Sequence, residues 1–111
     1  MKRRVNYEVF SKVDLRIGTI IKVEDFPKAR KLAYLLHIDF GPLGLRKTSA
    51  QITVLYTKEA LLGRQIVAIV NFPQKQIANI MSQCLVTGAV EEEKVFLLHP
   101  ETKVPNGTTV S

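Results

Sequence analysis

The chain has 111 residues, of which 46% are hydrophobic and 23% are charged, with a net charge of +6 and a pI of about 9.7. This length fits a single domain spanning residues 1–111, and the apolar content argues against disorder. The longest apolar stretches, Leu32–Leu36 and Ile66–Val70, are too short to insert into a membrane, and the basic start lacks the apolar stretch of a signal peptide. Cys84 is the single cysteine, so we expect no disulfide and a cytoplasmic location.

The first half of the chain predicts three strands with alternating apolar residues. Leu15–Val23 forms the first, in which Gly18 suggests a bend or a bulge. The second carries its core face at every other position, namely Leu32, Tyr34, Leu36, Ile38 and Phe40. Residues 41–44 are typical of a hairpin connection, and Leu45–Val54 is a third, partly solvated strand.

The second half predicts one short helix and further strands. Thr57 is suited to cap a helix of about two turns that ends before Gly63. The apolar stretch from Gln65 to Val70 is typical of a strand buried on both faces. We expect a loop over residues 71–83 with one amphipathic turn, a fifth strand at residues 84–87, and short extra strands at residues 95–98 and 108–110.

Five strands with a helix between the third and the fourth match the order of the all-β OB-fold, a small Greek-key barrel with its core at about residues 14–88. OB-folds bind ligands on strands 2 and 3 and on the loops that join strands 1–2 and 4–5. Residues 28–83 carry eight basic and two acidic side chains, so the whole net charge lies there. The predicted strands bring most of these bases to the ligand face, which favours an anionic partner. The alternative is a basic surface without a function.

Three motifs resemble those of the tRNA-binding-domain family, which occurs appended to some tRNA synthetases and as free dimers. The first is residues 14–20 (DLRIGTI), the second is Pro27, Ala29, Lys31 and Leu32, and the third is Ser82-Gln83. Residues 49–53 (SAQIT) and 71–78 (NFPQKQIA) resemble more closely the CsaA-like group, export-related chaperones of the same fold. Synthetase-type domains usually have Arg-Gly where this chain has Ala78-Asn79, and Gly in place of Cys84.

The resemblance implies an OB-fold homodimer that binds unfolded or precursor polypeptides. It also implies tRNA binding and a link to the protein-export machinery. It implies a dimer interface formed by an N-terminal helix and C-terminal strands, to which these apolar residues would contribute: Tyr7, Val9, Phe10, Val13, Val95, Phe96, Leu97 and Leu98. The alternative is that both ends fold back onto their own barrel. Insertion into a membrane is not expected.

The candidate ligand-binding residues fall into two chemical groups. The nucleic-acid candidates are cations for phosphates, with amides and hydroxyls for base edges or a peptide backbone: Lys28, Arg30, Lys31, Arg46, Lys47, Ser49, Asn71, Lys75, Ser82 and Gln83. The peptide candidates are apolar residues beside the basic groove: Phe26, Phe72, Ile77 and Ile80. Phe72 and Ile80 could instead belong to the core. Two alternative functions are a tRNA-binding module that uses the same groove and a subunit that delivers another protein to RNA.

Catalysis is not indicated by the sequence. His37 and Asp39 share a strand face without a nucleophile at useful spacing, so a solvated polar pair is the simpler interpretation. His99 precedes a proline in a predicted turn, and residues 91–93 form an acidic turn. One cysteine and two distant histidines do not make a zinc site, and Cys84 is expected to be a buried structural residue. We therefore expect a protein that is not an enzyme and that uses neither metal nor cofactor.

Overall fold

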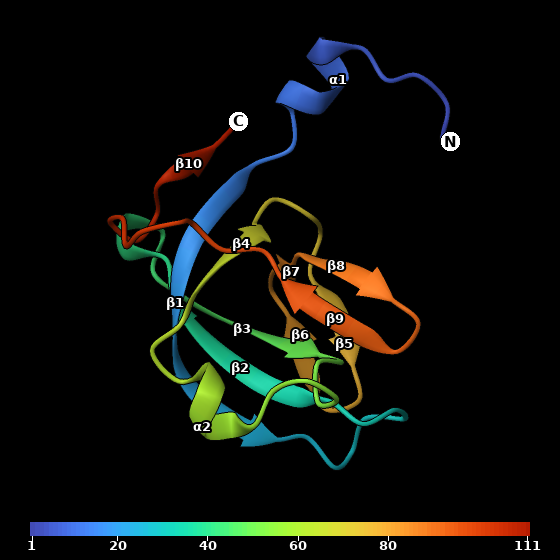
Figure 1. Cartoon of the computed structure of the whole chain (residues 1–111), viewed down its shortest axis with the longest axis vertical. Helices are drawn as coiled ribbons and strands as arrows, with labels where there is room; N and C mark the ends of the chain where they lie inside the picture. The colour runs from blue at the N-terminus through green and yellow to red at the C-terminus, as the bar shows by residue number, and fades with distance from the viewer.

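The computed structural model describes all residues from Met1 to Ser111 and consists mostly of strands (Figure 1). The helical elements are α1 (Tyr7–Ser11), the 3₁₀ turn η1 (Gly41–Leu43) and α2 (Lys58–Leu61). The strands are β1 (Leu15–Asp25), β2 (Tyr34–Asp39), β3 (Leu45–Ala50), β4 (Gln65–Ile69), β5 (Lys75–Ile77), β6 (Ile80–Ser82), β7 (Leu85–Val86), β8 (Gly88–Glu91), β9 (Lys94–Leu97) and β10 (Thr109–Val110). No helix is both long enough and apolar enough to cross a membrane.

The main sheet is antiparallel and curls into a nearly closed barrel. Its strand order is β3-β2-β1-β4-β7, and β10 pairs with β1. Lys47 of β3 and Gln83, two residues before β7, connect the two outer strands of the sheet. The Lys47 N–H donates to Gln83 Oε1, and the Gln83 N–H donates to the Lys47 carbonyl, both at 2.9 Å. A five-stranded barrel with a helix between β3 and β4 is the OB-fold, so the fold predicted from the sequence is confirmed.

The barrel interior is filled by the alternating residues of the strands. Leu36, Ile38 and Phe40 are completely buried, as the period of two predicts, together with Ile20 of β1 and Ile66 of β4. Leu32 was predicted on the same core face, but it is 84% exposed because β2 begins only at Tyr34.

Helix α2 lies between the predicted capping residues, but it is four residues long, about one turn where two were expected. The Thr57 side chain accepts a hydrogen bond from Ala60 N–H at 3.2 Å, and Gly63 follows the helix with φ +84°. Leu61 is fully buried in the main core. The helix therefore covers one end of the barrel with a single apolar side chain.

The bulge in β1 lies three residues beyond the expected glycine. The register with β2 shifts between Ile20 and Lys22, so that Ile21 and Lys22 are both exposed. Gly18 has a different role, because a Cβ at this position would lie 2.6 Å from Ile38 Cγ2 and 2.7 Å from the Phe40 ring. Gly18 therefore does not bend the strand; it leaves room for the side chains of Ile38 and Phe40, which pack directly against its backbone.

Several predicted boundaries were wrong in the second half of the chain. β3 ends at Ala50, before the expected Val54, and the expected loop over residues 71–83 contains the β5–β6 hairpin. The fifth strand of the main sheet is β7, which lies within the predicted residues 84–87, whereas β6 pairs with β5 in a separate two-stranded sheet. The β8–β9 hairpin replaces the single strand expected at residues 95–98.

Candidate functional site

The outer surface of β1, β2 and β3 is the face that OB-folds offer to ligands, and we call it the basic face. On β3, Thr48 and Ala50 are buried whereas Lys47 and Ser49 point outward. Their register partners on β2 are His37 and Leu35, respectively. Lys47 and Ser49, two of the nucleic-acid candidates, therefore lie on the expected face.

The β1–β2 loop brings three more candidate cations to one edge of this face. Lys28, Arg30 and Lys31 are all exposed. The loop is anchored by Phe26, which is 6% exposed and packs with Ala33 and Ile80 in a second, smaller core. A buried anchor of this kind holds the cations in place while it leaves their charged ends in solvent.

The β5–β6 hairpin packs against the same loop. Ile77 and Ile80 of the hairpin pack in the second core, against which Leu35 of β2 also lies. Lys75 is exposed on this hairpin, opposite Ser82 in the ladder. The two loops that flank the ligand face of an OB-fold therefore touch each other, and both carry basic side chains.

This packing corrects two of the four peptide candidates. Phe26 and Ile80 are buried, because they join the two loops, and cannot offer an apolar surface to a peptide. Ile77 is half-buried in the same cluster. Phe72 remains half-exposed.

Four of the nucleic-acid candidates have partners within the chain. Arg46 Nη1 donates to the Val70 carbonyl at 2.6 Å, and Ser82 Oγ lies 2.7 Å from Thr48 Oγ1. Gln83 closes the barrel against Lys47, as described above. These side chains, together with Asn71, hold parts of the barrel together, and their role in direct recognition stays a prediction.

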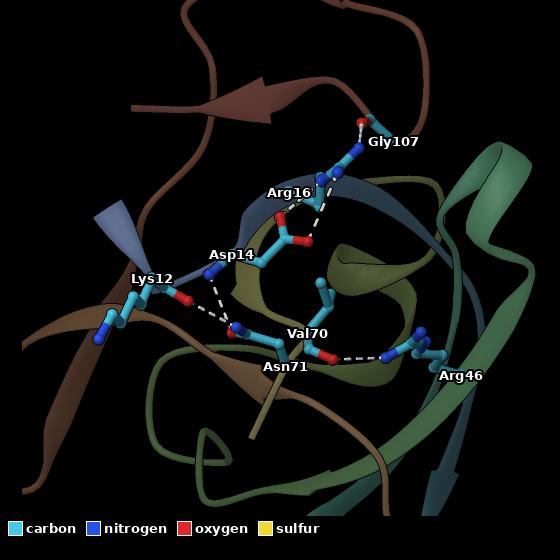
Figure 2. Close-up of polar contacts among 7 residues, drawn as sticks. All are labelled: Lys12, Asp14, Arg16, Arg46, Val70, Asn71 and Gly107. Atoms are coloured by element: carbon cyan, nitrogen blue, oxygen red, sulfur yellow. Dashed lines mark hydrogen bonds and ion pairs between the residues drawn. The ribbon is translucent and has the colours of Figure 1, made fainter. Parts of the chain in front are cut away.

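Asn71 connects the end of β4 to the segment that precedes β1 (Figure 2). Its Oδ1 accepts from Asp14 N–H at 2.8 Å, and its Nδ2 donates to the Lys12 carbonyl at 2.6 Å. Asp14 in turn forms an ion pair with Arg16, which donates to the Gly107 carbonyl. Both ends of the chain are thus held at one end of the barrel.

A groove that the sequence did not indicate runs beside the basic loop. Its lining mixes aliphatic side chains with polar and charged ones, and we call it the apolar groove for the aliphatic side chains that it exposes. It consists of two adjoining cavities of about 650 and 480 Å³, which share Gln51, Val90 and Val95. Leu32 and Val90 are the most exposed apolar side chains along it, and Lys31, Glu92 and Glu93 also line it. Leu32 and Val90 were not predicted as binding residues, because apolar residues in short strands and turns give no signal that they will be exposed.

The proposed dimer residues are mostly exposed. Helix α1 has no buried residue, and Tyr7, Val9 and Phe10 all present apolar surface (Figure 1 shows the helix standing away from the barrel). Phe96 and Leu98 are half-exposed, whereas Val13 and Val95 are less so. Leu97 is a correction: it is 6% exposed and belongs to the main core, because β9 turns alternate residues toward the barrel.

The polar residues considered as catalytic candidates in the sequence have simpler roles. His37 Nε2 lies 2.9 Å from Glu24 Oε2, and Asp39 accepts from Gly41 N–H at 2.8 Å. His99 is exposed, and residues 92 and 93 form the turn of the β8–β9 hairpin. No group of three or more His, Cys, Asp or Glu side chains is placed to hold a metal ion.

Cys84 is buried between β6 and β7, as the sequence predicts. Burial raises the pKa of its thiol to about 12, although the nearby Arg46 opposes this effect. The thiolate is the reactive form, so we expect the folded protein to resist a disulfide reagent at pH 8. The measurement is the rate of thiol labelling in native buffer and in denaturant; equally fast labelling in both would contradict the assignment.

Comparisons with known proteins agree with this geometry. Residues 15–109 match the family model described as a putative tRNA binding domain. The solved structure of chaperone CsaA from Bacillus anthracis has a TM-score of 0.94 and 50% identity, covering 98% of this chain and all of that one. The CsaA chaperone protein from Picrophilus torridus has a TM-score of 0.91 and 46% identity, covering 97% of this chain and all of that one.

Curated relatives include much longer proteins. The methionine–tRNA ligase of Pyrococcus furiosus is 40% identical over 106 residues, which are 96% of this chain but 14% of that protein. The chain thus corresponds to a small part of these ligases.

Proposed function

Because the chain belongs to the family of putative tRNA-binding domains and is similar to CsaA chaperones over its whole length, we propose that it is a non-enzymatic, CsaA-like chaperone. In this proposal it works as a dimer in the cytoplasm, holds segments of unfolded or export-bound polypeptide, and also binds tRNA. The observation that carries the polypeptide function is the apolar groove, whose exposed aliphatic side chains suit an apolar segment. A connection to the protein-export machinery belongs to the same proposal.

The tRNA function is supported by the basic face. Lys28, Arg30 and Lys31 of one loop, Lys47 of β3 and Lys75 of the facing hairpin are cations on adjoining elements. Lysine and arginine side chains bind phosphates without regard to sequence, and this suits a folded RNA. A structure-specific tRNA-binding module without chaperone function is the alternative that this observation favours.

The dimer is supported by the exposed apolar residues near both ends of the chain. A five-residue helix is only marginally stable alone in water, so α1 needs a surface on which to pack. In a two-fold contact, α1 of each protomer would cover Phe96 and Leu98 of the other, a self-complementary arrangement. Light scattering coupled to gel filtration should give the mass of two chains, and Phe10→Asp combined with Phe96→Asp should give one; a monomeric parent protein would contradict the dimer.

The two binding functions are distinguished by their dependence on salt. We expect tRNA affinity to fall steeply with potassium chloride, because each phosphate contact releases counterions, whereas capture of an apolar segment should change little. The polypeptide probe is a reduced, carboxymethylated protein that stays unfolded in native buffer. Binding of both probes is followed by fluorescence anisotropy.

Substitutions in the groove test whether unfolded polypeptide binds there. Val54→Asp together with Val90→Asp places charge on two exposed groove residues and should weaken polypeptide binding at least tenfold, roughly 1.4 kcal/mol, while tRNA binding changes little. Leu62→Asp, at an exposed apolar residue after α2, is the matched control. Equal losses in the groove and control variants, or no binding of unfolded polypeptide by the parent protein, would leave the tRNA-binding module as the function.

A further inference from the structure

Three side chains with nitrogen donors form one row across the basic face. Lys22 of β1 is the register partner of His37 of β2, and His37 is the register partner of Lys47 of β3. Neighbouring strands lie about 4.8 Å apart, so the row extends over roughly 10 Å.

The bulge in β1 is what completes this row. Ile20 points into the core, so regular alternation would turn Lys22 inward as well. The extra residue, Ile21, reverses the alternation, and Lys22 becomes exposed opposite His37. Bulges that redirect a side chain are common beside functional sites.

An acidic side chain already occupies part of the row. Glu24 Oε2 lies 2.9 Å from His37 Nε2, and Glu24 Oε1 lies 3.5 Å from Lys22 Nζ. Because an ionised carboxylate can only accept, His37 Nε2 must carry a proton and donate it. The hydrogen bond from His37 lowers the pKa of Glu24 below its ordinary value, as expected for a donor that stabilises the ionised carboxylate.

The donors that hold this carboxylate are the donors that a phosphate would use. We propose that Lys22, His37 and Lys47 form a binding site for RNA backbone phosphates, in which Glu24 is a resident anion that an incoming phosphate displaces. The inference rests on the proposed tRNA binding and deepens it. Glu24 makes the site selective, since only a ligand with dense negative charge can replace it at the two donors.

The surroundings favour phosphate over other ligands. The row carries no Phe, Tyr or Trp side chain on which a base could stack, and the ring of His37 is held by Glu24. Asp39, the acid on β2 that shares the face of His37, accepts a hydrogen bond from the backbone of η1. Lys22 and Glu24 are both open to solvent, so the exchange of one anion for another requires no movement of the backbone.

The test removes the resident charge and keeps the shape of the side chain. Glu24→Gln should bind tRNA about fivefold more tightly at low salt, and its affinity should fall more steeply with salt, by about 0.7 in the log–log slope, because one more phosphate is engaged. Glu59→Gln makes the same change of charge on α2, where Glu59 has no ion pair, and should bind like the parent protein. The gain from Glu24→Gln should vanish in a Lys22→Ala/His37→Ala background.

Three results would overturn the inference: no gain in Glu24→Gln, an equal gain in Glu59→Gln, or a gain that persists without Lys22 and His37. Linear inorganic polyphosphate, titrated in parallel, separates the inference from the proposed function. If the parent protein binds no tRNA but Glu24→Gln still strengthens polyphosphate binding through Lys22 and His37, the phosphate site stands and the tRNA function fails.

Discussion

Gly18→Ala is expected to lower the free energy of unfolding by about 3 kcal/mol. An alanine normally stabilises a strand relative to glycine, so the expected sign is unusual. It follows from the geometry, because the new Cβ would lie 2.6 Å from Ile38 Cγ2 and 2.7 Å from two atoms of the Phe40 ring, in a fully packed interior. Urea denaturation followed by far-UV circular dichroism measures the change.

A double mutant isolates the clash. Ile38→Ala removes the Cγ2 atom that the new methyl group would meet, although it costs stability by leaving a cavity. Gly18→Ala in the Ile38→Ala background should therefore cost less than it does in the parent protein. Additive losses would show that Ile38 is not the side chain that the new methyl group meets, and a stabilising Gly18→Ala would show that Gly18 is not required for packing.

Asn71→Ala is expected to destabilise the protein by about 2 kcal/mol and to release the N-terminal segment. The substitution removes the acceptor of the Asp14 N–H and the donor to the Lys12 carbonyl, the two bonds that tie the segment before β1 to the end of β4. Amide hydrogen exchange should accelerate at Asp14. The dissociation constant of the proposed dimer should rise, because α1 loses its anchor.

Gln74→Ala provides the matched control, since Gln74 is exposed on the same loop between β4 and β5. Exchange at Asp14 should be unchanged in this variant. If Asn71→Ala were as stable and as protected at Asp14 as the control, Asn71 would be free to serve as a ligand contact after all.

The order of the elements could be predicted because each long element carries its own signal. The alternation in β2 and the capping residues of α2 act over short distances in the chain, and both are confirmed by the structure. The three-residue strands β5 and β6 are too short to show a period. The bulge at Ile21 depends on pairing between β1 and β2, so local sequence does not reveal it.

Of the candidate site, the sequence predicts the chemical type of the residues but not which of them face the ligand. Exposed lysines such as Lys31 and Lys47 lie where the fold places its ligand face, but sequence alone does not tell whether a polar side chain will bind a ligand or its own backbone. Gln83 and Arg46 are examples, since their partners lie 36 and 24 residues away. The same long-range packing buried Phe26 and Ile80 and exposed Leu32 and Val90.

The most direct test is the salt dependence of tRNA binding by Lys31→Ala/Lys47→Ala, compared with Lys94→Ala/Lys103→Ala. Both double variants lose two exposed or partly exposed cations, but only the first loses them from the basic face and its loop. We expect the first to bind at least tenfold more weakly, with a log–log slope shallower by about 1.5, and the second to match the parent protein. Equal losses in the two variants, or none in the first, would contradict binding of RNA at the basic face.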